Sequence, residues 1–125
     1  HICFGYAALI HERPEGYSFL PELANTRGHQ VSSEPGQSNL DCEVLRSLDD
    51  KRILLGVLDL STEEVETVDV IRERVRRALE HVEPERILLA PDCGMKYLSR
   101  DAAFGKLRNM ALAAAQLRDE FRSGG

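Results

Sequence analysis

The sequence predicts an α/β fold of four βα units, which is the C-terminal half of a TIM (β/α)8 barrel. Two apolar runs, Arg52 to Leu58 and Arg86 to Ala90, have the continuous hydrophobicity of parallel strands buried on both faces. A helical pattern follows each run, and such alternation requires a parallel sheet. A full barrel takes about 250 residues, so the 125 residues here match four of its eight units. We therefore expect residues 1–125 to form one domain, with the N-terminal half of the barrel absent. An open three-layer sheet is the alternative.

The helices after these two strands have clear start signals. Thr67 and Ser99 can each cap a helix, because their hydroxyl oxygens accept hydrogen bonds from the first backbone amides. Pro84 ends the first of these helices. In the second helix we expect the buried stripe to consist of the following apolar residues: Phe104, Leu107, Ala111, Ala114, Leu117 and Phe121.

The first part of the chain shows a weaker version of the same order. His1 to Phe4 resembles the last turn of a strand, and Phe19 to Thr26 indicates a short helix that Gly28 ends. Gln30 to Ser33 indicates a short strand. A helix capped by Ser38 then runs to Leu48 and stops before Asp49.

Composition excludes several classes of function. A net charge of -5 with no cluster of Lys and Arg predicts no nucleic-acid and no anionic-membrane partner. No apolar run approaches the roughly 20 residues of a transmembrane helix. Three widely spaced cysteines do not form a disulfide framework. We therefore expect a cytoplasmic protein whose cysteines serve metal binding or catalysis.

Four side chains of metal-ligand type follow the predicted strand ends. His1 and Cys3 are two residues apart and leave the same face of an extended segment, while Glu34 and Cys93 each follow a later strand. The C-terminal ends of barrel strands open on one face, so these four side chains are expected to meet there. Their donors, two sulfurs, one nitrogen and one oxygen, suit tetrahedral zinc. Cys42 lies within a helical segment and is expected to be a core thiol.

The region from Ile87 to Arg118 consists of a strand, a Pro-Asp-Cys-Gly turn and a helix. The helix contains an Asn-Met pair and ends in Leu-Arg. In these features, and in the His-x-Cys and the intervening Glu, the chain resembles the cobalamin-independent methionine synthase superfamily. The resemblance implies a zinc ion held by His1, Cys3, Glu34 and Cys93. It also implies methyl transfer from a small-molecule donor to a thiol, with homocysteine as the expected acceptor. Zinc keeps such a thiol deprotonated and nucleophilic.

The chain departs from the family where a catalytic acid is expected. Methionine synthases of the family commonly have Asp-x-His after this strand, whereas this chain has Asp59, Leu60 and Ser61. We assign Asp59 and Ser61 to the catalytic site, although Ser61 cannot protonate a leaving amine near pH 7. Residues 95–98 are more similar to a less characterised branch of the family, which is related to epoxyalkane:coenzyme M transferase.

Three functions stay open. The chain can be part of a zinc-dependent methyltransferase or of a thiol alkyltransferase that uses an epoxide-like electrophile. It can also be an inactive metal-binding fragment. Four βα units also leave two apolar strand edges open, and open edges pair readily with other chains. We therefore expect the chain to belong to a longer protein or to associate with itself.

Overall fold

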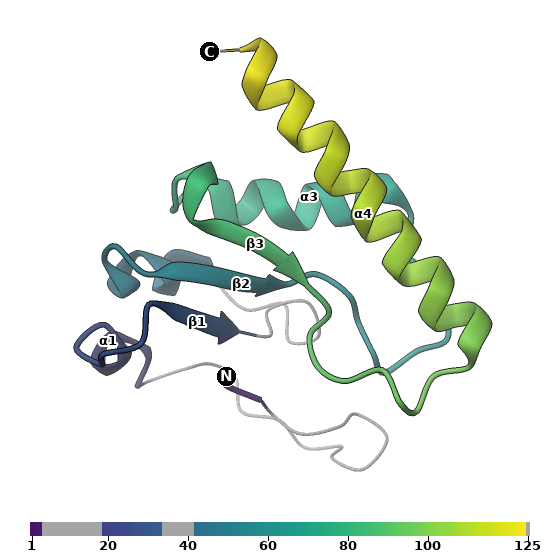
Figure 1. Ribbon diagram of the computed structural model, residues 1–125, viewed down its shortest axis with the longest axis horizontal. Helices are drawn as coiled ribbons and strands as arrows, with labels where there is room; N and C mark the ends of the chain where they lie inside the picture. Colours follow the sequence, from purple (N-terminus) through teal and green to yellow (C-terminus); the bar gives the residue numbers. More distant parts are fainter. Residues whose placement is uncertain (4–18, 34–41, 125) are drawn as a thin grey trace.

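The computed structural model describes residues 1–3, 19–33 and 42–124 of the chain. Its centre is a sheet of three parallel strands in the order β1-β2-β3, whose arrowheads all point the same way in Figure 1. The strands are β1 (Gln30–Ser33), β2 (Arg52–Gly56) and β3 (Ile87–Ala90). The alternation of apolar runs with helical segments therefore gives the α/β parallel sheet that the sequence predicts.

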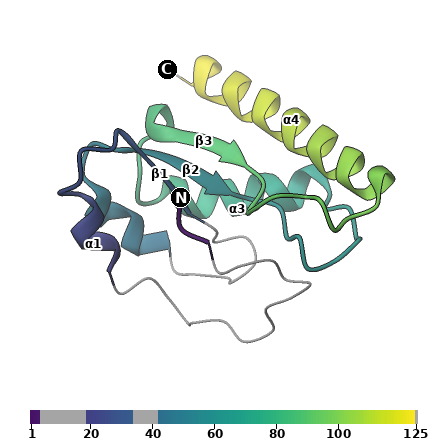
Figure 2. The same cartoon turned by 60° about the horizontal axis from the view of Figure 1, so that its bottom comes forward.

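Helical segments precede β1 and follow every strand. They are α1 (Leu20–Leu23), the 3-10 helix η1 (Cys42–Leu48), α3 (Val68–Leu79), the short 3-10 helix η2 (Pro84–Arg86) and α4 (Arg100–Ser123). η1 packs against α1 and α3, and α3 packs against α4, which also contacts β3. Figures 1 and 2 show η1 and α3 on the same side of the sheet. No helix in the described part of the chain has both the length and the hydrophobicity that a membrane crossing requires.

The predicted strands are found with small shifts at their ends. The strand expected over Arg52 to Leu58 ends at Gly56, although the Val57 amide still donates to the Ala90 carbonyl at 2.9 Å. The strand expected from Arg86 begins one residue later, because η2 occupies the preceding turn. The strand Gln30–Ser33 is found as predicted.

The N-terminal segment lies beside β1, as both views show. The Ile2 amide donates to the Ser32 carbonyl at 3.0 Å, so the segment makes a sheet-like contact without being assigned as a strand. Phe4, which completes the predicted strand end, lies outside the described residues. The structure therefore shows three strands, and the fourth βα unit stays a prediction.

The remaining helix predictions for the first part of the chain have mixed outcomes. The helix expected over Phe19 to Thr26 is reduced to the single turn of α1. Ser38 lies outside the described residues, and the segment from Cys42 onward is a 3-10 helix. It stops before Asp49 as expected, and Asp49 has a left-handed φ of 50° that a helix cannot continue through.

The two predicted helix caps that lie in the described residues, Thr67 and Ser99, are confirmed. The Thr67 hydroxyl accepts a hydrogen bond from the Val70 amide, and the Ser99 hydroxyl accepts one from the Ala102 amide, each at 3.2 Å. Glu63 strengthens the second cap, because its carboxylate accepts hydrogen bonds from both the amide and the hydroxyl of Ser99. These bonds lower the pKa of Glu63. The start of α4 is thereby tied to the loop that precedes α3.

Of the predicted buried stripe of α4, only Leu117 is buried, and Ala114 is half-buried. Phe104 is 68% exposed, and Leu107 and Phe121 are also exposed. The helix instead buries Ala102, Lys106, Ala113 and Leu117. The helix also comes close to Val65, because a Cβ on Gly105 would lie only 3.0 Å from that side chain. The apolar spacing alone did not reveal which face of α4 is buried.

Only one face of the sheet is well covered by the described residues. Val31, Ile53 and Leu55 are buried and belong to the continuous hydrophobic core with η1 and α3. Alternate residues point to the opposite face, where Leu54 is half-buried and Leu88 is 39% exposed. Burial of the strands on both faces is therefore not observed within the described residues.

Gly56, at the end of β2, permits a close contact between neighbouring strand ends. A Cβ at this position would lie 2.2 Å from Asp92 Oδ1 and 2.9 Å from the Ser33 carbonyl oxygen. The Asp92 side chain is only 1% exposed, so it has little room to move away. The absence of a side chain at Gly56 lets the end of β1 and the turn after β3 come close together over β2.

We expect Gly56→Ala to destabilise the fold by about 2 kcal/mol or more, because the added methyl group overlaps packed atoms. Gly28→Ala is the matched control, since its Cβ would have no neighbour closer than 3.7 Å. That change should stay within about 0.5 kcal/mol of the parent. Urea denaturation at constant m-value measures both. Equal effects from the two substitutions would contradict the importance of this contact.

Candidate metal centre

Three of the predicted ligands meet at the C-terminal edge of the sheet. The possible donor atoms of His1, Cys3 and Cys93 all lie within 4.8 Å of one another. The two sulfur atoms are 3.4 Å apart, although their residues are separated by 90 positions. Cys93 reaches this place because it stands three residues beyond Ala90, the last residue of β3. The parallel sheet thus unites residues from opposite ends of the chain.

β1 positions His1, the imidazole donor of the cluster. His1 Nδ1 lies 2.9 Å from the Ser32 hydroxyl oxygen, next to the backbone bond between Ile2 and Ser32. A metal-binding histidine commonly uses one ring nitrogen for the metal while a hydrogen bond at the other fixes the ring. The contact with Ser32 can provide that second bond for His1.

The chemistry of these donors fits zinc. Two thiol sulfurs and one imidazole are donor types that Zn²⁺ prefers, and their spacing permits all three to contact one ion. His1 and Cys3 are exposed and Cys93 is half-buried.

The fourth predicted ligand and the remaining cysteine have different outcomes. Glu34 lies outside the described residues, so its part in metal binding stays a prediction. Cys42 begins η1 and is half-buried against the hydrophobic core, as expected for a packing thiol. No disulfide joins the three cysteines, all of which are described.

Asp59 and Ser61 lie in the loop that follows β2, at the same end of the sheet as Cys93. The amide and the hydroxyl of Ser61 both donate to Asp59 Oδ1, at 2.8 and 2.6 Å. A carboxylate that binds the amide two residues later forms a turn of the Asx type, which is a local structural role. Whether either side chain lines a cavity with the metal ligands stays a prediction.

Sequence reasoning missed a buried ion cluster under this loop. Lys106 of α4 is fully buried, and its Nζ lies 2.6 Å from Glu66 Oε1. Arg74 of α3 lies 2.8 Å from Glu66 Oε2. Burial raises the pKa of Glu66, but hydrogen bonds from Lys106, the Asp59 amide and Arg74 outweigh it and hold that pKa below its usual value. One signal in the sequence was the spacing of Lys106, four residues after Ala102 and seven before Ala113 on the buried face of α4.

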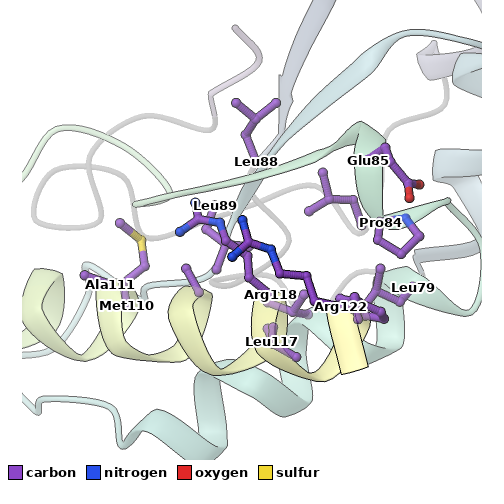
Figure 3. Close-up of a pocket in the computed structure, with 14 residues that line it drawn as sticks. Leu79, Pro84, Glu85, Leu88, Leu89, Met110, Ala111, Leu117, Arg118 and Arg122 are labelled. Atoms are coloured by element: carbon purple, nitrogen blue, oxygen red, sulfur yellow. The ribbon is translucent and has the colours of Figure 1, made fainter. Parts of the chain in front are cut away.

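A cavity of about 640 Å³ lies elsewhere, between β3 and α4 (Figure 3). Figure 3 shows Leu89, Met110 and Leu117 around it, with the side chains of Arg118 and Arg122 extending between α4 and β3. The three clustered ligands, Asp59 and Ser61 are not among its lining residues. The cavity is therefore separate from the candidate metal centre.

Comparison with known proteins agrees with this arrangement. The family model for the cobalamin-independent synthase catalytic domain matches residues 32–116. A methionine synthase from Pyrococcus furiosus is 36% identical over 126 aligned positions, covering 100% of this chain and 35% of the relative. A methionine synthase from Methanothermobacter thermautotrophicus is 43% identical over 77 residues, covering 62% of this chain and 25% of the relative.

A solved structure adds evidence from the fold. The B12-independent methionine synthase from Shewanella sp. W3-18-1, in complex with selenomethionine, superimposes with a TM-score of 0.80 and 27% sequence identity. The match covers 83% of this chain and 30% of that protein. The chain thus spans about a quarter to a third of the length of the relatives it matches. By sequence and by fold, it belongs to the cobalamin-independent methionine synthase superfamily, within the catalytic domain.

Proposed function

We propose that this chain is the thiol-activating part of a zinc-dependent methyltransferase that converts homocysteine to methionine. The cluster of His1, Cys3 and Cys93 carries the proposal, because its donors suit zinc and lie at the C-terminal strand edge. The names of the relatives support the choice of reaction. In this proposal the chain contributes the C-terminal half of a (β/α)8 barrel, and the protein is cytoplasmic, where thiols stay reduced.

The described residues of the cluster would hold the metal, with Glu34 as the fourth and most easily displaced ligand. When bound, Zn²⁺ would keep a substrate thiol deprotonated at neutral pH, where a free thiol with a pKa of about 8.5 is mostly protonated. The Cys3 and Cys93 thiolates would offset the charge of the ion. Ser32 would keep the His1 ring oriented toward the cluster.

A second function is favoured by one observation at the loop after β2. Ser61 stands where the family commonly has a histidine, and its hydroxyl is bonded to Asp59. A serine hydroxyl does not release a proton near pH 7, so this side chain does not supply a general acid for an amine leaving group. Opening of an epoxide-like electrophile by the activated thiol is therefore the alternative reaction. An inactive metal-binding fragment is the third possibility.

We expect the chain to retain about one Zn²⁺ per molecule after dialysis, and Cys93→Ser to lose it, because the substitution removes a thiolate ligand. Cys42→Ser is the matched control, since this cysteine packs outside the cluster, and it should retain zinc. Elemental analysis of the dialysed proteins gives the stoichiometry. Stoichiometric zinc in Cys93→Ser would show that the metal is held at a site that does not depend on Cys93.

We expect the whole protein that carries this chain to methylate homocysteine when supplied with a methyl-folate donor. Mass spectrometry of the thiol product distinguishes the three functions. A methylated thiol supports the proposal, while a hydroxyalkyl thioether formed from an epoxide supports the alternative. If zinc-loaded protein forms neither product, the third possibility holds. Cys93→Ser serves as the control for zinc dependence.

We also expect the isolated chain to associate with itself at micromolar concentration, because no strand among the described residues pairs with the outer edge of β3, where Leu88 is exposed. Leu88→Lys should weaken this association, since a charge at the strand edge opposes pairing. Val70→Lys is the control, because Val70 is 43% exposed on α3. Sedimentation velocity over a range of concentrations measures the effect. A monodisperse monomer of the unaltered chain would contradict this expectation.

A further inference from the structure

Asp59 is held at both of its backbone polar groups by one ion pair. Its amide donates to Glu66 Oε2 at 2.7 Å, and its carbonyl accepts from Lys106 Nζ at 2.9 Å. Glu66 and Lys106 also bind each other at 2.6 Å. The two peptide groups that flank the Asp59 side chain are therefore fixed by groups from outside the immediate turn.

Lys106 and Glu66 are buried, and their charged atoms all form hydrogen bonds. Lys106 is 0% exposed, and its Nζ makes a third bond to the Glu64 carbonyl at 2.6 Å. A lysine ammonium has three donors, and here each has an acceptor. Glu66 is 9% exposed and also accepts from Arg74, which donates to the Val57 carbonyl as well. Burying charges is unfavourable unless they are well paired, so this cluster is a costly way to provide stability alone.

Lys106 and Glu66 fix the loop of Asp59, and this loop leaves the sheet at the same edge as the loop of Cys93. Gly56 and Ala90 are partners in the register of β2 and β3. Asp59 and Cys93 each stand three residues beyond these partners, so both loops leave neighbouring strands at the same edge. α4 begins soon after Cys93 and carries Lys106, so the helix that follows one loop holds the other.

We propose that Lys106 and Glu66 are positioning residues that set Asp59 at the edge of the sheet where Cys93 lies. This inference rests on the proposed function, because it gives the position of Asp59 a purpose in thiol transfer. Lys106 acts through the backbone of Asp59 and is not itself a catalytic residue.

Lys106→Met is the first test, because it keeps the length of the side chain and removes the ammonium. Lys51→Met is the matched control. Lys51 is also buried, at 7% exposure, and its Nζ also donates to loop carbonyls, those of Thr26 and Gly28. It precedes β2 and therefore lies at the opposite end of the sheet from Asp59.

Amide hydrogen exchange separates local positioning from general stability. The Val57 amide, bonded to Ala90, serves as an internal reference in each variant. Lys106→Met should raise the exchange rate of the Asp59 amide relative to Val57 by about tenfold or more, because its local closure is lost. Lys51→Met should change both rates together. An unchanged ratio in folded Lys106→Met would overturn the proposal.

Activity of the whole protein gives the second readout. Lys106→Met should lower kcat by roughly 10- to 100-fold, since a misplaced group in a site reduces the rate strongly. The KM for the thiol and the zinc content should stay unchanged. Lys51→Met should keep the parent kcat, and an equal loss in both variants would count against positioning.

A second variant and the exchange ratio cover the cases in which Lys106→Met does not fold or the protein is inactive. If Lys106→Met does not fold, Glu66→Gln replaces it, because this change weakens the bond to the Asp59 amide while keeping the side-chain shape. It should raise the same exchange ratio, and failure to do so would overturn the proposal. If the unaltered protein transfers no methyl or alkyl group, the proposed function fails, and the exchange ratio still decides whether the pair positions Asp59.

Discussion

The parallel ladder of β1, β2 and β3 is the constraint on which the rest of this structure depends. Because the strands run the same way, every loop that leaves a C-terminal strand end emerges at one edge. The Asp59 loop follows β2, and Cys93 follows β3. The N-terminal segment reaches the same edge through its backbone bond to Ser32 of β1. The donor cluster is thus a consequence of strand direction.

Close packing at the edge depends on residues with little or no side chain. Gly56 leaves room for the buried carboxylate of Asp92, which directly precedes the candidate ligand Cys93. Gly105 does the same for α4, which approaches Val65 closely. Interiors of proteins are packed to near-crystal density, so such contacts transmit the position of one element to the next. The geometry of the cluster of His1, Cys3 and Cys93 therefore depends on the packing of these neighbouring elements.

The buried charged side chains around the loop after β2 provide hydrogen-bond partners for its backbone. A loop between a strand and a helix has backbone groups that need hydrogen-bond partners once it is buried. Lys106 and Glu66 supply these partners from α4 and from the loop itself, and Arg74 adds a bond from α3. The two helices are thereby attached to the loop by charged groups as well as by apolar contact.

The sequence by itself determined the order of the described strands and helices, the helix caps Thr67 and Ser99, and which three donor side chains lie together. Continuous apolar runs, capping hydroxyls and the His-x-Cys and Pro-Asp-Cys-Gly patterns are local signals, and local signals can be read from neighbouring residues. Tertiary structure decided the buried face of α4, where Lys106 is fully buried while Phe104 is 68% exposed. It also decided the role of Lys106, whose acceptors Asp59 and Glu66 are 47 and 40 positions away. A charged residue is buried only when folding brings such partners to it, and no local pattern contains that information.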